Sequence, residues 1–490
     1  MNTKSNARLS GGTIRFVLAA VALGGMVGSP LAGALGSPLA GASPADGLPP
    51  TFGRPGEVFR PDVARAPGVI EPTFKGEMLA VPTVPMPARA AVMSRVEVVA
   101  QMDWVPGNIT VTPKGRMLVS AHPFGRPGVA RGELPYIAEV FGAEVFGAEV
   151  VGAEVGGAEV IGGGVSNAGG VAGAGRVRFI DEPWTRPINP ETSIGFSNII
   201  GLRSDPKGIV YMLDMGQPEA AFTVDAGPRL LAPKIIIWDS NTGGLMNMLL
   251  LEGNEKFGGS AFTPKSFLQD LAVDHKRGLL YLADSGIGKG FDDPTPAIVV
   301  VRIDNAQTRR VLSSHPLVMP EPGAAMVIGG VEVRTRGADG RISVPRVGLN
   351  PIAIDAECEW VYFGGMHGTK IYKVRAEDLA NDLLTDEQLA AKVSVHGPKG
   401  VSDGIAMDAA GNIYVTDVNH SAIGVLDQQG RYRLIAQDEA LLAWPDGLSV
   451  GVDGYVYATV NQLNRHAALN AGVSAEKAPF AVVRVRIKAE

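Results

Sequence analysis

The sequence is poor in cysteine, in basic charge and in long apolar runs. A single cysteine, Cys358, among 490 residues excludes an internal disulfide and any cysteine-cluster metal site. Lysine and arginine number 44 against 50 aspartates and glutamates, and the net charge of −6 argues against a generally basic surface for nucleic acid. Beyond the N-terminal region, no stretch offers the roughly 18 uninterrupted apolar residues of a transmembrane helix.

Glycine and proline, in contrast, are abundant, at 63 and 35 residues. This is too much for a mainly helical protein and is typical of short strands joined by turns. Hydrophobic residues make up 46% of the chain and charged residues 19%, so we expect most of it to fold.

The N-terminus has the pattern of an export signal. Three basic residues precede the apolar run Phe16–Val27, which is too short to cross a bilayer and suits a signal-peptide core. We therefore predict a signal peptide over residues 1–42, a secreted or periplasmic protein and no membrane association after cleavage; an uncleaved anchor is the alternative. Residues 43–90 are rich in Pro, Gly and Ala without periodicity, which predicts a flexible linker.

From residue 96 onward one hairpin pattern recurs. A lead residue, polar in five of the six copies, opens a short alternating strand, a tight turn follows, and an aromatic or β-branched strand completes the hairpin. The six copies begin at Asn108, Ile200, Gln269, Asn350, Asp403 and Asp446.

The last two lead residues lie 43 positions apart, about the length of a four-stranded propeller blade. Six such sheets around one axis would bury their apolar faces against each other. The sequence therefore predicts an all-β fold, a six-bladed β-propeller over residues 91–490. A pair of β-sandwiches is the alternative, but it does not explain why one frame repeats six times.

Two stretches interrupt this frame. Gly-Ala-Glu-Val recurs four times between residues 142 and 160, and its five-residue period gives no stable apolar face on a helix or a strand. We therefore predict a disordered insertion over residues 125–175, between the first two hairpins. The leucine spacing of Ala376–Val393 predicts a helix in two pieces, broken at Thr385 and Asp386, between the fourth and fifth blades.

Several short motifs follow one another in a fixed order along the frame, among them Ser402-Asp403-Gly404, Trp444-Pro445-Asp446-Gly447 and Asn461-Gln462-Leu463. Together they resemble the major royal jelly/yellow protein family, in particular its bacterial members, which are related to gluconolactonase-like propellers. The resemblance covers about residues 95–488 apart from the Glu-Val repeat. It implies a secreted six-bladed propeller, in agreement with the independent count of six hairpins.

The resemblance predicts the function less specifically than the fold, since relatives are linked to pigment chemistry, to the binding of small amines or to nutrition. The chain departs from the family pattern in three ways. Gln269 stands where relatives usually have Asn, the disulfide cysteines of animal members are absent, and the Glu-Val repeat is foreign to the family.

The hairpin geometry predicts where a ligand would bind. If the first strand of each hairpin is innermost, the lead residues ring one mouth of the central tunnel. The ends of the second strands, with His122, His367 and His420 just beyond, would add polar groups there. A concave end with convergent polar groups is a typical ligand site. The predicted ligand-binding residues are Asn108, His122, Gln269, Asp284, Asn350, Asp403, His420, Asp446 and Asn461.

A cation could share this mouth. The oxygen atoms of Asp403, Asp446 and Asn350 suit Ca²⁺ or another divalent cation, although turn capping alone could explain these residue types. Gluconolactonase-type relatives add a Glu in the first blade, and the segment Trp104–Asn108 has none. This difference ranks a metal-assisted lactonase below a binding protein.

Three functional hypotheses follow. The first is an exported, monomeric propeller that binds a small organic ligand at one tunnel mouth. The second is an enzyme on the same fold, either a metal-assisted lactonase or a quinone-type tautomerase. The third is a structural or interaction protein without an active site. No catalytic residue can be assigned: Ser402 lacks a Gly-x-Ser-x-Gly elbow, and Cys358 is predicted to be a buried thiol in a core turn.

Overall fold

The computed structural model describes residues 85–125, 135–141, 175–189, 191–192, 194–216, 232–251, 261–288, 290–337 and 339–487. The predicted signal peptide, most of the predicted linker and the Gly-Ala-Glu-Val repeat lie outside these ranges. The described residues belong to one compact unit, Met78–Glu490. In this part of the chain, no helix is long and apolar enough to cross a membrane.

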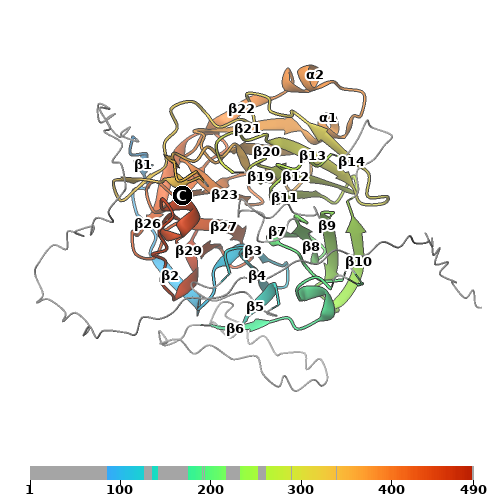
Figure 1. The fold of residues 1–490 in the computed structure, drawn as a ribbon, viewed down its shortest axis with the longest axis horizontal. Coiled ribbons are helices and arrows are strands. Elements are labelled where there is room, and N and C mark those ends of the chain that lie inside the picture. Colours follow the sequence, from blue (N-terminus) through green and yellow to red (C-terminus); the bar gives the residue numbers. More distant parts are fainter. Residues whose placement is uncertain are drawn as a thin grey trace, which may run out of the picture. The chain divides into compact units, whose positions relative to one another are not determined.

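Six sheets, each with a core of four antiparallel strands, surround one axis, which confirms the predicted six-bladed β-propeller (Figure 1). The innermost strands are β3 (Pro106–Val111), β7 (Ile199–Ser204), β11 (Leu268–Asp274), β19 (Leu349–Ile354), β23 (Ser402–Met407) and β27 (Pro445–Val450). The second strands are β4 (Met117–Ala121), β8 (Ile209–Asp214), β12 (Leu279–Asp284), β20 (Trp360–Gly365), β24 (Ile413–Asp417) and β28 (Tyr455–Val460).

The outer half of each sheet is built in the same way. The third strands are β5 (Ile137–Phe141), β9 (Lys234–Asp239), β13 (Ala297–Arg302), β21 (Lys370–Arg375), β25 (Ala422–Leu426) and β29 (Phe480–Arg486). The outermost strands are β6 (Arg176–Phe179), β10 (Gly244–Leu250), β14 (Thr308–Val311), β22 (Ser394–Pro398), β26 (Tyr432–Gln437) and β2 (Val96–Met102).

The two ends of the described chain close the ring in the sixth sheet. Strand β2 pairs antiparallel with the C-terminal strand β29, so that Val96 faces Val485. Residues from both ends of the described chain thus complete the same sheet. A ring closed in this way leaves only short, protected strand edges. In the fifth sheet, the short strand β1 (Ala88–Arg89) adds in parallel to β26. The predicted linker therefore extends too far, because its last residues are paired.

The faces between neighbouring sheets are apolar, as their alternating sequences predict. The third and fourth sheets, for example, bury Tyr281 and Phe363 in one cluster. The hydroxyl of Tyr281 donates to Asp274 and to the backbone carbonyl of Ala376, each at 3.1 Å. Burial of such aromatic and aliphatic surface drives the sheets together, and the buried hydroxyl keeps its hydrogen bond.

The predicted helix forms in two pieces, α1 (Ala376–Ala380) and α2 (Asp386–Ala390). The Thr385 hydroxyl accepts a hydrogen bond from the Gln388 amide, and the Gln388 side chain accepts one from the Thr385 amide. This capping box starts α2 and explains the break between the two helices. The predicted place of the helix was wrong: the two helices connect β21 to β22 and lie within the fourth sheet.

Two further expectations concern the loops and the cysteine. Strand β5 (Ile137–Phe141) falls inside the predicted insertion 125–175, whose bounds are therefore too wide; in the sequence, the repeat itself falls between β5 and β6, and so between the first two hairpins as predicted. Cys358 is buried in a turn with a φ of 53°, as predicted for a core thiol.

The remaining elements are short and belong to connecting segments. Two small hairpins, β15 (Val327–Ile328) with β16 (Val331–Glu332) and β17 (Thr335–Arg336) with β18 (Ile342–Ser343), lie between the third and fourth sheets. The 3₁₀ turns are η1 (Pro183–Thr185), η4 (Leu463–Arg465) and η5 (Ala467–Leu469).

Candidate functional site

Every innermost strand has a β-bulge near its start. In β23 the register jumps from Ser402 opposite Asp417 to Ile405 opposite Val415, so two residues on β23 oppose one on β24. The other five innermost strands have the same register shift, which no sequence motif predicted. A bulge bends its strand and changes the direction of its side chains. In each sheet, two residues of the innermost strand lie in the bulge.

The bulges sort the axial residues into two levels. The first bulge positions are Gly107, Ile200, Gln269, Asn350, Asp403 and Asp446, and the second are Asn108, Gly201, Asp270, Pro351, Gly404 and Gly447. Asn108 was predicted to share a ring with Asp403. It belongs instead to the second level, with Asp270, so the predicted frame of the first sheet was wrong by one residue.

Close packing at the axis explains the two Asp-Gly pairs. A Cβ on Gly404 would lie 2.3 Å from the carbonyl oxygen of Asp446, and one on Gly447 would lie 2.5 Å from the Cα of Asn108. Only glycine lets neighbouring strands approach this closely. Asp403 and Asp446 therefore do not owe their position to turn capping, the alternative that the sequence left open.

Asp403 is held by two neutral donors. The Asn350 amide donates to its Oδ1 and the Trp444 indole to its Oδ2, each at 2.6 Å. Only 5% of Asp403 is exposed. Burial, with a smaller contribution from the charge of Asp270, raises its pKa to about 6.

Asp446 is the neighbouring carboxyl group. Its Oδ2 accepts a hydrogen bond from the amide of Asn461. Burial, and next the charge of Asp403, raises the pKa of Asp446 well above its ordinary value. The negative charge of either group therefore disfavours ionisation of the other.

Asp270, one level deeper, has a charged partner. The guanidinium of Arg203 lies 2.5 Å from its Oδ2, and the amide of Asn108 donates to its Oδ1 at 3.1 Å. Arg203 also donates to the carbonyl oxygens of Leu448 and Ile405, at 2.6 and 3.2 Å. Arg203 thus contacts side-chain or backbone atoms of three other sheets. It lies across the tunnel below the carboxyl groups of Asp403 and Asp446.

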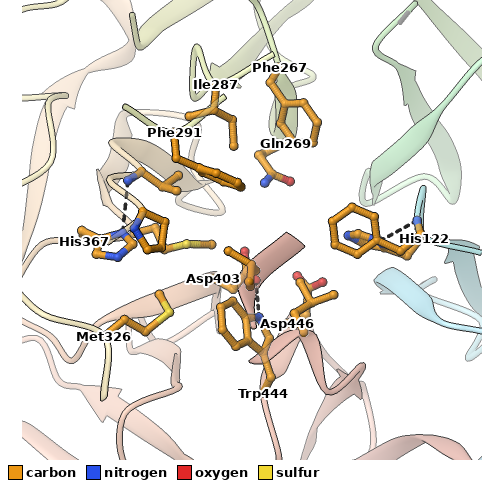
Figure 2. Close-up of a pocket in the computed structure, with 16 residues that line it drawn as sticks. His122, Phe267, Gln269, Ile287, Phe291, Met326, His367, Asp403, Trp444 and Asp446 are labelled. Carbon is orange, nitrogen blue, oxygen red and sulfur yellow. Dashed lines mark hydrogen bonds between the residues drawn. The ribbon is translucent and has the colours of Figure 1, made fainter. Parts of the chain in front are cut away.

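Above these carboxyl groups lies a cavity with mostly apolar walls (Figure 2). Its polar residues are Gln269, Asp403 and Asp446 at the level of the bulges, and His122 and His367 on opposite sides. The other lining residues are aromatic or aliphatic: Phe124, Phe267, Ile287, Phe291, Met326, Pro345, Val347, Met366, Trp444, Leu463 and Leu469.

Two connecting segments contribute walls to this cavity: one supplies Met326, Pro345 and Val347, and the other supplies Leu463 and Leu469. They contact one another through the backbone: the Arg334 amide donates to the Leu469 carbonyl at 3.3 Å, and the Ala471 amide donates to the Arg334 carbonyl at 2.8 Å. Because loop residues carry no strand periodicity, these walls could not be predicted from the hairpin pattern.

Backbone amides fix the two cavity histidines. The Phe124 amide donates to Nδ1 of His122 at 3.1 Å, and the Val347 amide donates to Nδ1 of His367 at 3.2 Å. An accepting Nδ1 leaves the proton of a neutral imidazole on Nε2. Burial lowers the pKa of His367 to about 4, so this ring is neutral near pH 7.

The structure brings together only some of the predicted site residues. His122, Gln269, Asp403 and Asp446 line the cavity, and Asn350 and Asn461 support the carboxyl groups from behind.

Asp284 and His420 hold loops instead, which corrects their predicted place. Asp284 accepts hydrogen bonds from the hydroxyl of Ser266 and the amides of Phe267 and Gly286, while His420 contacts Asp417 at 2.7 Å. Asp214, at the end of β8, does the same: it accepts hydrogen bonds from the amides of Ser197, Asn198 and Gly216, and it is buried against Lys234 at 3.0 Å. Sequence reasoning missed Asp270, Arg203 and Trp444. The adjacency of Asp270 to Gln269 was the one available signal.

The predicted cation site does not fit this arrangement. Ca²⁺ takes six to eight oxygen ligands, but three of the four oxygens of Asp403 and Asp446 already accept hydrogen bonds, from Asn350, Trp444 and Asn461. Asn350 turns its nitrogen, not its oxygen, to Asp403. Among the described residues, no three His, Cys, Asp or Glu side chains are grouped to hold a metal ion.

Comparisons with known proteins bear on fold and family. The chain is similar to a gluconolactonase from Xanthomonas campestris, at 10% identity over 83% of this chain and 99% of that one, with a TM-score of 0.42. It is also similar to a calcium-binding regucalcin from Agrobacterium tumefaciens, at 13% identity over 82% and 98%, with a TM-score of 0.40. A comparison with curated proteins finds no match.

A family model described as major royal jelly protein matches residues 205–489, more than half of the sequence. The match includes four of the six innermost strands, β11, β19, β23 and β27, together with Asp403, Asp446 and the residues that donate hydrogen bonds to them, Asn350, Trp444 and Asn461. The resemblance noted in the sequence is thereby confirmed, and the chain belongs to the major royal jelly protein family.

Proposed function

We propose that this propeller binds a small organic molecule in the mouth cavity and holds it through Asp403 and Asp446. One observation carries the proposal: two buried carboxyl groups, bonded only to neutral donors within the described chain, line a cavity with aromatic and aliphatic walls. An apolar cavity with a few convergent polar groups is the usual form of a small-molecule site.

The electrostatics favour a ligand that carries a protonated amine or another strong donor. The raised pKa values of Asp403 and Asp446 reflect burial without a cation to stabilise the ionised forms. A ligand cation would supply that charge, and the ring faces of Phe267 and Phe291 in the walls would favour the same charge. The remainder of the ligand would be apolar, to match the walls.

A second candidate is proton transfer on such a ligand, as in a quinone-type tautomerase. The pKa of about 6 for Asp403, beside a second carboxyl group, suits a group that exchanges a proton near neutral pH. A metal-assisted lactonase lacks comparable support, because the carboxyl oxygens are occupied by hydrogen-bond donors. The proposal includes export by the predicted signal peptide and action as a monomer.

Calorimetric titration with phenethylamine and its neutral analogue 2-phenylethanol tests the proposal. We expect the amine to bind the wild type and to lose about tenfold or more in affinity in Asp446→Asn, as for a lost charge-assisted hydrogen bond. Binding of the neutral analogue should change little. The control variant is Asp239→Asn, at the end of β9, where its carboxylate accepts from the Asn241 amide of the turn to β10. Equal amine affinity in wild type and Asp446→Asn would contradict the proposal.

A further inference from the structure

His367 contributes a buried hydrogen-bond donor that nothing in the described chain satisfies. The side chain lines the mouth cavity and only 2% of the residue is exposed. Its Nε2 is buried and has no hydrogen-bond partner among the described residues. Buried polar groups in folded proteins almost always have a partner, so an unpaired one in a cavity calls for a specific reason.

The geometry of His367 is fixed by a segment that contributes a wall of the cavity. The Val347 amide donates to Nδ1 at 3.2 Å, and the His367 amide donates to the Val347 carbonyl at 3.0 Å. The next amide back, that of Met366, donates to the carbonyl of Gly348 at 2.7 Å. Because Nδ1 is occupied as an acceptor, the free nitrogen is the donor Nε2–H.

The surroundings of His367 keep this donor neutral and set it apart from the carboxyl groups. Burial, with smaller contributions from the positive charges of Lys399 and Arg346, lowers the pKa of His367 to about 4. Among the described residues, the charges that act on the ring are those of Lys399 and Arg346, whereas Asp403 and Asp446 lie toward the middle of the view in Figure 2. The cavity therefore offers acceptors at its base and, on the side of His367, a fixed donor.

We propose that Nε2–H of His367 selects ligands that carry an oxygen acceptor in addition to the amine or donor group bound by Asp403 and Asp446. This inference rests on the proposed function and narrows it to bifunctional ligands. An ether, carbonyl, hydroxyl or carboxylate oxygen would satisfy Nε2–H, and a purely hydrocarbon body would leave it unpaired. His367 is in this sense a specificity-determining residue and takes no part in any chemical step.

Matched probes isolate the acceptor from all other contacts. The 2-, 3- and 4-methoxyphenethylamines carry an ether oxygen that accepts but does not donate, and the corresponding ethylphenethylamines replace that oxygen by a methylene group. We expect at least one methoxy isomer to bind the wild type about three- to tenfold more tightly than its ethyl partner, the range of a neutral hydrogen bond. The measured quantity is this affinity ratio, from calorimetric titration at pH 7.

Three variants separate recognition from a structural role. His367→Phe removes the donor, and we expect the ratio to fall to about one. His367→Asn keeps an acceptor near the place of Nδ1 for Val347 but cannot reach the place of Nε2, so its ratio should also fall. His367→Gln presents an N–H near Nε2 and should restore part of the ratio. A loss of stability that is merely structural would weaken both probes and leave their ratio unchanged.

The outcomes distinguish a failure of the His367 inference from a failure of the proposed function. A ratio that is the same in wild type and His367→Phe overturns this inference while amine binding, and with it the proposed function, stands. If the ethyl probes bind and no methoxy isomer is favoured, the inference is likewise wrong. If no amine binds the wild type, the proposed function fails and the inference fails with it. In ¹⁵N-labelled protein, a downfield shift of the His367 Nε2–H proton on addition of the favoured methoxy probe would support the assignment directly.

Discussion

The indole N–H of Trp444 donates a hydrogen bond of 2.6 Å to Oδ2 of Asp403 and so ties the sixth sheet to the fifth. Trp444 adopts a φ of 63°, a left-handed conformation that is rare for a bulky residue. Strain of this kind persists only where the surroundings impose it, and it is common at functional sites. The contact places an aromatic wall and a carboxyl group of the cavity in one fixed relationship.

Replacing Trp444 by Phe should destabilise the protein by about 1–3 kcal/mol, because it leaves one buried oxygen of Asp403 without its donor. It should also raise the pKa of Asp403 further, since the indole N–H lowers it now. Urea unfolding at pH 7 measures the loss. Trp360→Phe is the matched control, because Trp360 is half-buried on the fourth sheet against Lys373 and Arg375. Equal losses in both variants would contradict a special role for the Trp444 contact.

The repeating part of this architecture was predictable, and the cavity was predictable only in part. Six hairpins with alternating strands indicate six sheets, because strand and turn signals are local. The position of Asn108 was wrong by one residue because the bulge that sets its level depends on packing against the next sheet, at Gly447. Asp284 has the residue type of a ligand group, but its oxygens accept hydrogen bonds from Ser266, Phe267 and Gly286. Ser266 and Phe267 are distant from Asp284 in the sequence, so no local pattern reveals these bonds.

The two cavity carboxyl groups should make stability depend on pH in a defined direction. Their folded-state pKa values lie above the ordinary value of 3.8, so the folded protein binds more protons than the unfolded chain above about pH 4. Stability from this source is therefore lost as the pH rises from about 4 through the folded-state value, about 6 for Asp403. Asp446→Asn removes one group, and we expect this variant to gain stability relative to wild type between pH 4.5 and 7.5.

Asp239→Asn provides a control of opposite sign for that experiment. The backbone amide of Asn241, and then the hydroxyl of Thr242, hold the pKa of Asp239 below its ordinary value. This variant should be less stable than wild type by nearly the same amount at pH 4.5 and pH 7.5, because Asp239 is ionised in both the folded and the unfolded chain well above its ordinary pKa of 3.8. Urea midpoints at the two pH values measure both differences. A pH-independent difference for Asp446→Asn would show that Asp446 is not perturbed.

Calcium and chelator should leave the thermal midpoint of the wild type unchanged. The oxygens that were predicted to bind a cation accept hydrogen bonds from Asn350, Trp444 and Asn461 instead. Thermal melts compare the protein in about 5 mM Ca²⁺, enough to fill weak extracellular-type sites, with the protein in excess chelator. A rise in midpoint with Ca²⁺ that disappears in Asp403→Asn would restore the cation hypothesis.

The bulge glycines should tolerate no side chain. In Gly404→Ala the new Cβ would lie 2.3 Å from the backbone carbonyl oxygen of Asp446, and backbone cannot move aside as a flexible side chain could. We expect a loss of several kcal/mol, as for overpacking in a core, which costs about 1–3 kcal/mol or more, together with weaker probe binding. Gly244→Ala on the exposed start of β10 meets only the Thr242 hydroxyl at 3.3 Å and serves as control. Similar stability of the two variants would contradict the close approach at the axis.

The ion pair between Arg203 and Asp270 provides the last test, because it obstructs the tunnel below the cavity. Arg203→Met should destabilise the protein by about 3–5 kcal/mol, the cost of leaving a buried charge without its partner. Asp270 is 3% exposed, and burial already raises its pKa against the opposing charge of Arg203. The double variant Arg203→Met/Asp270→Asn should recover most of the loss, because the uncompensated charge is gone while the Asn oxygen can still accept from the amide of Asn108. Urea unfolding of wild type, both single variants and the double variant forms a complete cycle. If the double variant is as unstable as the sum of the single variants, the two residues act independently, and Arg203 stabilises the axis through the carbonyls of Leu448 and Ile405 rather than through Asp270.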